Sequence, residues 1–441
     1  MISEDDDAGA EPRAPRGPQD TATAATRAYV LHPDLKTTRR RRLAEHGLAE
    51  AVSLAAALPG LEVIGAEVVR LSKVAPGMLF GMGKVDELKA RFKEQEIALV
   101  LVDGTVGPVQ QRNLEKEWGV KLLDRTGLIL EIFADRARTR EGVLQVELAA
   151  LSYQRSRLVR AWTHLERQRG GFGFVGGPGE TQIESDRRAI DDEVIKLKRQ
   201  LEQVVKTREL HRAARRKVPF PIVALVGYTN AGKSTLFNRM TGADVLAKDM
   251  LFATLDPTMR GVTLPSGRKC IVSDTVGFIS DLPTQLVAAF RATLEEVLEA
   301  DLILHVRDIA HPETAEQAAD VADILTSLGV NADTPQIEVW NKLDLVPPET
   351  RAALEANKAN RANVYAISAL TGEGLPALFD AISTAFDEAK TEAELTLTFA
   401  QGRHHAWLHG EGVVVSEAQS DDGWQMLVRW TPRQEARFRQ L

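Results

Sequence analysis

The chain has 441 residues, of which 44% are hydrophobic and 27% charged, and its formal net charge is −7. This length exceeds what one compact core supports, so we expect two to four domains. The acidic balance argues against a general nucleic-acid coat protein, which would be basic. The single cysteine, Cys270, excludes an internal disulfide and fits a reducing compartment. Its apolar neighbours predict a buried, structural thiol.

No apolar run approaches the roughly 20 residues that a membrane span needs. The N-terminus is acidic, whereas a signal peptide begins with basic residues. We therefore expect a cytoplasmic protein, with peripheral association with a membrane left open. Nothing in the sequence demands a dimer, so a monomer is expected. Residues 1–25 carry almost no large apolar side chains and are expected to form a disordered acidic tail.

Residues 26–143 alternate short apolar runs with amphipathic stretches, which predicts an α/β domain with a mainly parallel sheet. Strands are expected at 28–31, 61–69, 98–103 and 120–123, and helices at 84–95 and 109–118. We find no catalytic constellation in this region. Asp103 and Asp124 end predicted strands and are interpreted as turn or cap residues.

Residues 144–217 contain two long stretches in which apolar residues recur with four-three spacing. This pattern predicts two helices packed as an antiparallel hairpin, the second about 30 residues and roughly 45 Å long. The hairpin is basic although the chain is acidic. Its cations are Arg155, Arg157, Arg160, Arg167, Arg169, Lys196, Lys198, Arg199, Lys206, Arg208, Arg212, Arg215, Arg216 and Lys217. Such a concentration suits the phosphates of RNA or DNA, and the alternative is a solvated surface.

The tip of the hairpin, residues 170–179, contains six glycines and two phenylalanines. Phe172 and Phe174 could stack on unpaired bases, while the glycines allow close approach of the backbone. The alternative is a flexible loop whose phenylalanines pack on their own hairpin.

Residues 218–390 again alternate strands with helices, which predicts a doubly wound domain. The run Gly227-Tyr-Thr-Asn-Ala-Gly-Lys-Ser234 follows a buried strand and opens a helix. This spacing is typical of a phosphate-binding loop, whose N–H groups point at phosphate oxygens. We expect Lys233 to contact the β and γ phosphates and the Ser234 hydroxyl to bind Mg²⁺.

Two motifs at the ends of later strands complete a nucleotide pocket. In Asp274-Thr-Val-Gly277, the carboxylate can hold Mg²⁺ through water and the Gly277 amide can sense the γ phosphate. In Asn341-Lys-Leu-Asp344, Asp344 can accept from the ring N–H and amine of guanine, donors that adenine lacks in this arrangement. The sequence therefore predicts a GTPase of the P-loop class.

The loop Leu251–Thr258 lies between these motifs, and a threonine in it would complete the Mg²⁺ shell. Thr254 is the preferred candidate and Thr258 the alternative. Phe278 follows Asp-x-x-Gly, where many GTPases carry a glutamine that orients the attacking water. We therefore expect slow unaided hydrolysis. Asn230 could ligate K⁺ beside the α and γ phosphates, or it could only stabilise the loop turn.

These motifs resemble those of the HflX family of bacterial translation GTPases. The resemblance covers residues 26–390 and is carried by 124–130, 141–147, 176–181 with Glu184, Arg187 and Arg188, and by 227–235, 252–256, 274–278 and 341–344. It implies binding near the peptidyl-transferase region of the large ribosomal subunit, with the hairpin loop reaching ribosomal RNA. It also implies GTP-dependent splitting of stalled or idle ribosomes and hydrolysis stimulated by the subunit.

The resemblance further implies a set of nucleotide contacts. They are Gly227, Tyr228, Thr229, Asn230, Ala231, Gly232, Lys233, Ser234, Thr235, Phe252, Ala253, Thr254, Leu255, Asp256, Asp274, Thr275, Val276, Gly277, Asn341, Lys342, Leu343, Asp344, Ser368, Ala369 and Leu370. Lys233, Thr254 and Gly277 would serve catalysis, and Ser234 and Thr254 would bind the metal.

Residues 391–441 contain alternating runs that predict a small C-terminal α+β domain, and no motif assigns them a role. The alternative function for the whole chain is a signalling GTPase whose hairpin binds a protein, such as a regulator of a membrane protease. The basic, glycine-tipped hairpin favours the ribosome, because a protein-binding hairpin would expose apolar anchors.

Overall fold

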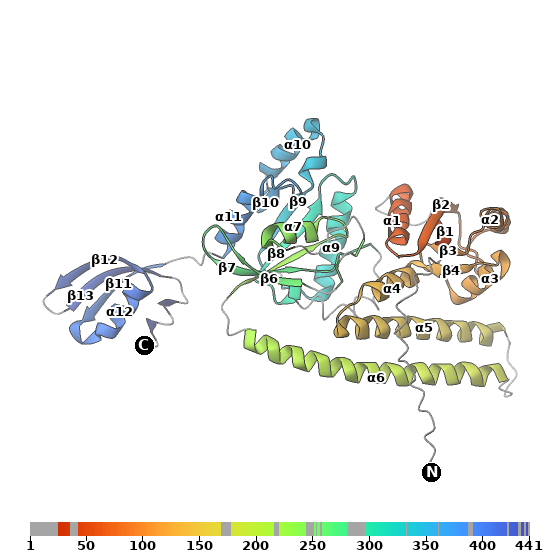
Figure 1. Cartoon of the computed structure of the whole chain (residues 1–441), viewed down its shortest axis with the longest axis horizontal. Helices are drawn as coiled ribbons and strands as arrows, with labels where there is room; N and C mark the ends of the chain where they lie inside the picture. Colours follow the sequence, from red (N-terminus) through yellow and green to blue (C-terminus); the bar gives the residue numbers. More distant parts are fainter. Residues whose placement is uncertain are drawn as a thin grey trace, which may run out of the picture. The chain divides into compact units, whose positions relative to one another are not determined.

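The computed structural model describes residues 25–35, 43–168, 178–215, 220–243, 251–252, 254–255, 258–280, 296–331, 333–359, 361–386, 391–420, 423–430, 434–435 and 438–439. Side chains are described in these ranges except over 158–183, at 205 and over 207–215. Apart from Ala25 and the Pro178–Gly179 pair, the predicted acidic tail and glycine-rich tip lie outside the described residues. The described elements form three sheets and a helical hairpin (Figure 1).

The N-terminal region forms a four-stranded sheet of order β2-β1-β3-β4, with all pairs parallel, as predicted. Its strands are β1 (Thr26–Leu35), β2 (Leu61–Leu71), β3 (Leu99–Val102) and β4 (Lys121–Asp124). Its helices are α1 (Ala44–Ala56), α2 (Met82–Glu94), α3 (Pro108–Trp118) and α4 (Arg125–Arg136). Buried aromatic rings fill the core between α2, α3 and the sheet, where Phe92 meets Trp118 edge-on at 5.2 Å.

Helices α5 (Arg140–Gln168) and α6 (Pro178–Arg215) form the predicted hairpin and lie side by side (Figure 1). Leu144, Val194 and Leu197 from the predicted seam are buried, and Arg155 Nε on α5 lies 2.7 Å from Asp191 Oδ1 on α6. Helix α6 has 38 residues, more than predicted, because it begins at Pro178, inside the predicted tip. Proline suits a first helical turn, whose N–H groups have no intrahelical partner.

The third region is a six-stranded sheet of order β10-β9-β8-β5-β7-β6. Its strands are β5 (Ile222–Gly227), β6 (Thr258–Thr263), β7 (Lys269–Asp274), β8 (Leu302–Asp308), β9 (Gln336–Asn341) and β10 (Val364–Ala366). Its helices are α7 (Lys233–Thr241), α9 (Thr314–Leu328), α10 (Pro348–Ala359) and α11 (Leu375–Ala385). Strand β6, which the sequence did not predict, pairs antiparallel with β7. The buried strands β5, β7 and β8 were predicted, and Cys270 is buried on β7 as expected.

Strand β5 lies between β8 and β7, so successive connections leave it on opposite sides. A doubly wound sheet binds ligands at such a switch point, beyond the carboxyl ends of its strands. The phosphate loop, Asp274 and Asn341 all follow the carboxyl ends of strands in this sheet. The topology therefore gathers the predicted nucleotide residues along one edge.

The C-terminal region forms a three-stranded antiparallel sheet of order β11-β13-β12, covered by one described helix. The elements are β11 (Thr391–Thr398), α12 (Gly402–Gly410), β12 (Val414–Ser420) and β13 (Gly423–Trp430). Leu408 of α12 packs with Met426, Val428 and Trp430 of β13 in a small core. In the part of the chain that the structure describes, no helix is long and apolar enough to cross a membrane.

Candidate functional site

The phosphate loop joins β5 to α7, and two of its glycines are required by their neighbours. A Cβ at Gly227, where φ is +155°, would lie 2.1 Å from the carbonyl oxygen of Val306 on β8. A Cβ at Gly232, where φ is +91°, would lie 2.2 Å from Nδ2 of Asn341 on β9. A side chain at position 227 would displace strand β8. A side chain at position 232 would displace Asn341, the first residue of the base-binding motif Asn341–Asp344 (the base motif). The shape of the loop therefore depends on contacts with β8 and β9.

Lys233 is buried at the start of α7. Its Nζ donates to the carbonyl oxygens of Gly227 at 3.0 Å and Tyr228 at 2.8 Å. Burial lowers the pKa of Lys233 to about 8, while the nearby Asp274 carboxylate acts in the opposite direction. An ammonium group held only by loop carbonyls can exchange them for phosphate oxygens, which bear full negative charge.

Three oxygen-bearing side chains from separate segments meet next to the loop. The Ser234 and Thr254 hydroxyls each lie 2.8 Å from Oδ2 of Asp274, and 2.9 Å from one another. The second carboxylate oxygen, Oδ1, is buried without a hydrogen-bond partner among the described residues. Burial raises the pKa of Asp274, against the effects of Lys233 and the two hydroxyls. Hydroxyl and carboxylate oxygens with spare lone pairs are the ligands Mg²⁺ prefers, so the residues present fit that ion.

Thr258, the alternative to Thr254, begins strand β6, where its backbone pairs with that of Asp274. The structure thus brings the Thr254 hydroxyl, rather than that of Thr258, to Ser234. Elsewhere in this loop, Phe252 and Leu255 are buried, whereas Ala253 and Asp256 lie outside the described residues.

Phe252 anchors the described part of this loop. Its backbone has a φ of +56°, a conformation that residues other than glycine rarely adopt. Its ring meets the fully buried ring of Phe133 on α4 edge-on, with centroids 4.6 Å apart. Sequence reasoning missed Phe133, because an apolar residue on a helix gives no indication of its tertiary partner.

The segment Asp274–Gly277 packs tightly against the phosphate loop. The Thr275 hydroxyl donates to the Leu225 carbonyl oxygen at 2.6 Å, and Val276 is buried. A Cβ at Gly277 would lie 2.9 Å from Cα of Thr229 and 3.1 Å from Nζ of Lys233. Glycine at 277 thus leaves room for the lysine, while the buried Thr229 hydroxyl has no partner among the described residues.

The Phe278 backbone pairs with the start of the phosphate loop, and its ring is buried. Its ring is 2% exposed, and its backbone bonds with Thr229 N at 2.7 Å and with Gly227 O at 3.1 Å. A buried phenyl ring cannot orient water, which agrees with the prediction from sequence. Asn230 at the outer turn of the loop is exposed, with a φ of +59°.

The base motif ties three loops together. Asn341 Nδ2 donates to the Ala231 carbonyl oxygen at 2.8 Å, and Asn341 Oδ1 accepts from Ala369 N at 2.9 Å. The predicted brace between Asn341 and the phosphate loop is therefore present in the structure. Lys342 has a φ of +65° and extends to Asp308 Oδ2, at 2.8 Å.

Asp344 is partly exposed, and its Oδ1 accepts from the Ser368 hydroxyl at 2.5 Å. This contact orients the carboxylate and leaves its other oxygen for a ligand. Leu343 and Ala369 are buried, whereas Leu370 is 72% exposed. The two segments that were predicted to hold guanine therefore lie next to each other.

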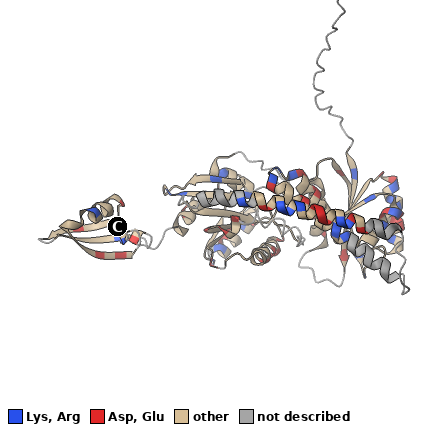
Figure 2. Ribbon diagram, turned by 90° about the horizontal axis from the view of Figure 1, so that it is seen from below, with Lys and Arg blue, Asp and Glu red and all other residues tan. Residues whose placement is uncertain are grey.

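The hairpin carries charge of both signs over its described length (Figure 2). Four of its described cations are paired with acids: Arg155 and Arg187 with Asp191, Arg188 with Glu184, and Lys196 with Glu193. Three others are exposed and make no ion pair with described residues: Lys198, Arg199 and Lys206. Phe172 and Phe174 lie outside the described residues. Among the described side chains of the hairpin, these three cations are exposed and lie in the carboxyl-terminal half of α6.

The N-terminal region contains a buried polar cluster whose contacts the sequence did not predict. Asp103 lies in the bend after β3, as interpreted, but its buried carboxylate also contacts His32 Nδ1 at 2.6 Å and Arg125 Nη1 at 2.5 Å. Burial would raise the pKa of Asp103, but Arg125 and His32 hold it below its usual range. Asp124 does cap α4, accepting from Gly127 N at 2.8 Å. Arg125 Nη2 also lies 2.5 Å from Glu50 Oε1, so these side chains form a buried ion-pair network.

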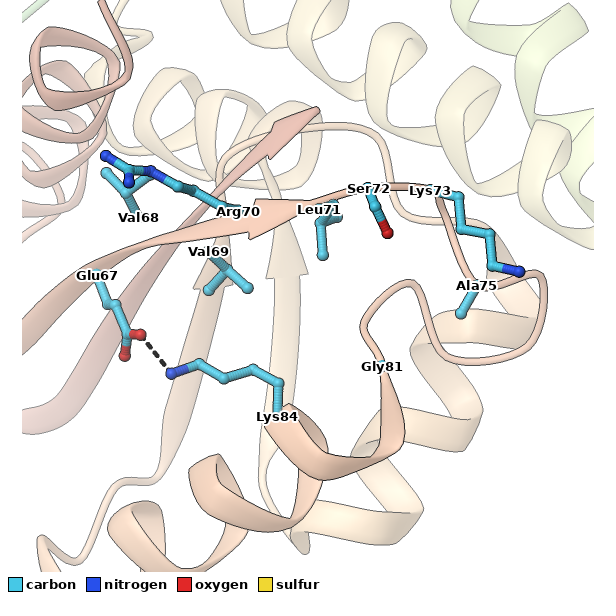
Figure 3. A pocket seen from close by; sticks show the side chains of 10 residues that line it. All are labelled: Glu67, Val68, Val69, Arg70, Leu71, Ser72, Lys73, Ala75, Gly81 and Lys84. Atoms are coloured by element: carbon cyan, nitrogen blue, oxygen red, sulfur yellow. Dashed lines mark hydrogen bonds and ion pairs between the residues drawn. The ribbon is translucent and has the colours of Figure 1, made fainter. Parts of the chain in front are cut away.

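A cavity of about 610 Å³ lies beside the edge strand β2 (Figure 3). Its charged lining includes Glu67, which pairs with Lys84 across the cavity and with Arg91 Nη1 at 2.5 Å. The remaining lining combines the apolar Val68, Val69, Leu71 and Ala75 with Arg70, Lys73, Ser72 and Gly81. The cavity belongs to the four-stranded sheet and shares no residue with the phosphate-loop cluster.

Four family models match the chain, and together they span most of it. They are described as GTP-binding GTPase N-terminal (residues 45–134), GTP-binding GTPase Middle Region (136–215), 50S ribosome-binding GTPase (222–342) and HflX C-terminal domain (353–440). The last match extends into the segment after residue 391, for which the sequence suggested no family motif.

Curated relatives named GTPase HflX align over most of their own length. The relative from Magnetococcus marinus is 50% identical over 413 residues, covering 94% of each chain. The relative from Escherichia coli is 43% identical over 366 residues, covering 82% of this chain and 85% of its own. That from Caldanaerobacter subterraneus subsp. tengcongensis is 43% identical over 380 residues, covering 86% of both. The four matched regions and the arrangement of phosphate loop, Asp274 and base motif agree, and the chain belongs to the HflX family of GTP-hydrolysing enzymes.

Proposed function

We propose that this GTPase binds the large ribosomal subunit through ribosomal RNA and uses GTP to split stalled or idle ribosomes. The observation that carries the proposal is a set of exposed cations on one helix of an acidic chain, Lys198, Arg199 and Lys206, which make no ion pair with the described residues. Exposed cations on a helix can neutralise the phosphates of a nucleic-acid backbone. The family model described as 50S ribosome-binding GTPase supports the same partner.

The pocket selects GTP through its base motif. Asp344 accepts hydrogen bonds from guanine, and Ser368 keeps the carboxylate in place from the neighbouring loop. Asn341 holds the phosphate loop to the base-binding segment, so both ends of the nucleotide meet one rigid unit. Lys233 provides the positive charge for the β and γ phosphates.

Ser234, Thr254 and Asp274 are the residues that would hold Mg²⁺. The support is their convergence and the buried Asp274 Oδ1 without a partner. When bound, the ion neutralises charge on the β and γ oxygens during phosphoryl transfer. Thr254 and Phe252 belong to the same loop. Contact between Thr254 and the Mg²⁺-bound triphosphate would therefore order this loop.

Hydrolysis is slow in the free protein, because Phe278 is buried and no glutamine follows Asp274–Gly277. Binding to the large ribosomal subunit accelerates GTP hydrolysis. Asn230 would ligate K⁺ through its side-chain oxygen, and its exposure at the turn of the phosphate loop supports this role. Such an ion would stabilise charge that develops between phosphates.

Co-sedimentation with purified large subunits tests the partner, and light scattering of intact ribosomes tests the splitting. The variant Lys198→Glu/Arg199→Glu/Lys206→Glu should bind weakly, and each lost phosphate contact should lower the slope of log K against log salt by about 1. The matched control is Arg187→Glu/Arg188→Glu/Lys196→Glu, which changes the net charge equally on the same helix at ion-paired positions.

Binding by the first variant at the level of the control would contradict the RNA contact. Absence of co-sedimentation with either GTP or a non-hydrolysable analogue would exclude the ribosome and favour a protein partner of the hairpin. If the protein bound ribosomes but light scattering from intact ribosomes did not decrease, splitting would be excluded and ribosome binding would stand.

A further inference from the structure

The C-terminal region contains a cluster of metal-binding side chains that the GTPase chemistry does not use. His405 and His409 lie one turn apart on α12, and Glu417 lies on β12. The Nε2 atom of His405 is 2.8 Å from Glu417 Oε1, and that of His409 is 2.8 Å from Glu417 Oε2. Each of the three side chains offers one ligand atom, and these three atoms lie within 4.8 Å of one another. Two segments therefore direct three ligands at one point.

The His405 ring is held in place by its neighbours. It stacks on Trp424 of β13 with centroids 4.2 Å apart and an interplanar angle of 24°. Its other neighbour is the His409 ring, with a centroid distance of 4.7 Å. Phe399 meets Trp424 edge-on at 5.0 Å and supports the stack. A ligand whose ring is fixed before binding loses little entropy when it binds an ion.

The donor set identifies the class of ion. Two imidazole nitrogens and one carboxylate oxygen suit Zn²⁺ and exclude the harder cations, which prefer oxygen alone. Tetrahedral Zn²⁺ has ligand bonds of about 2.0–2.1 Å, which places its ligand atoms roughly 3.3 Å apart. The present 2.8 Å contacts reach that separation after small rotations of the side chains. The three side chains are 23%, 48% and 26% exposed for His405, His409 and Glu417, so solvent can fill the fourth position.

An ion at this point would stabilise a region with little core of its own. Leu397, Leu408, Val413, Met426, Val428 and Trp430 are the buried residues of its cluster. Domains of this size commonly require a metal or disulfide in addition to apolar burial. We propose that His405, His409 and Glu417 form a Zn²⁺ site that links α12 to β12 and stabilises the C-terminal region.

The test uses the full chain without a polyhistidine tag, treated with chelator and free of nucleotide. Zn²⁺ is titrated by calorimetry, and Co²⁺ is used as a spectroscopic probe of tetrahedral coordination. We expect one equivalent to bind. Loss of an outer-shell partner alone costs about 10- to 100-fold in metal affinity, so His409→Ala and Glu417→Gln, which remove direct ligands, should cost at least as much.

His404→Ala is the matched control, because His404 is adjacent on the same helix but contacts Phe438 instead of the cluster. It should bind Zn²⁺ as the unaltered chain does. Thermal unfolding provides a second measurement: Zn²⁺ should raise the transition temperature of the unaltered chain and of His404→Ala, but not of Glu417→Gln. Absence of saturable binding, or equal affinity in all the variants, would overturn the proposal. Circular dichroism of the metal-free Glu417→Gln protein checks that it is folded. Loss of Zn²⁺ binding by a folded variant then results from loss of the ligand.

Discussion

The hydroxyls of Ser234 and Thr254 lie 2.9 Å apart, although 20 residues separate them, and both contact Asp274 Oδ2 at 2.8 Å. The phosphate loop, the following loop and the end of β7 thus share one polar contact. A group of hydrogen-bonded oxygen atoms from three segments is sensitive to the loss of any member, because each orients the others.

Thr254→Ala should reduce Mg²⁺-dependent GTP hydrolysis far more than Thr258→Ala. A hydrogen bond to a charged group contributes about 1.5–3 kcal/mol, which corresponds to a rate loss of roughly 10- to 100-fold. Single-turnover hydrolysis at several Mg²⁺ concentrations measures the effect. Thr254→Ser keeps the hydroxyl and should retain most activity. Equal losses at both threonines would show that Thr254 has no special role.

Phe133→Ala should destabilise the protein and loosen the loop around Phe252, since the two buried rings meet edge-on at 4.6 Å. Removing a buried phenyl ring typically costs about 3–5 kcal/mol. Affinity for a GTP analogue should fall more than affinity for GDP, because the triphosphate orders this loop. Fluorescent-nucleotide titration gives both affinities. Phe133→Leu, which retains most of the side-chain volume, is the control. An unchanged ratio of GTP-analogue affinity to GDP affinity in Phe133→Ala would show that Phe133 does not influence the loop around Phe252.

Asp344→Asn should shift nucleotide preference from GTP toward XTP. The substitution replaces an acceptor with a donor, which matches the carbonyl oxygen that xanthine has in place of the guanine amine. Competition binding with the two triphosphates measures the shift. Because Ser368 contacts Asp344 Oδ1 at 2.5 Å, Ser368→Ala should weaken GTP binding without changing the preferred base. Retained GTP preference in Asp344→Asn would remove this residue from base recognition.

Hydrolysis should be faster in K⁺ than in Na⁺ buffer, and Asn230→Ala should abolish the difference. The smaller Na⁺ ion does not match a site sized for K⁺, and the variant lacks the amide oxygen ligand. Steady-state rates at constant ionic strength provide the measurement, with and without large subunits. Equal rates of the unaltered protein in the two salts would show that Asn230 only stabilises its turn.

His305 on β8 should make stability depend on pH between about 4 and 6.5. Burial, with a contribution from Arg307, lowers the pKa of His305 to about 4, from 6.5. In this window the unfolded chain binds more protons than the folded one, so stability is complete above 6.5 and falls as the pH decreases toward 4. The shift corresponds to up to about 3 kcal/mol. His305→Asn should flatten this dependence in denaturant titrations at several pH values, and an unchanged slope would contradict it.

The nucleotide motifs lie at the carboxyl ends of strands, and these strands were predictable from sequence. Continuous apolar runs such as Ile222–Val226 indicate a buried parallel strand without knowledge of its neighbours. Strand β6 was not predicted, because only one of its six residues is buried and the strand is stabilised by pairing with β7. Helix α6 exceeded its predicted length because glycine at 179 lowers helix propensity but does not prevent a helix that packs on α5.

The sequence by itself determined the family and the chemistry of the pocket. Glycine spacing, Lys233 and the Asn341–Asp344 pattern act through local backbone geometry, so they can be recognised in the linear order of residues. Only the tertiary structure decided which threonine meets Ser234 and which ring supports Phe252. It also brought His405, His409 and Glu417 together from helix and strand. These relationships depend on the packing of separate segments, which residue type and spacing alone do not specify.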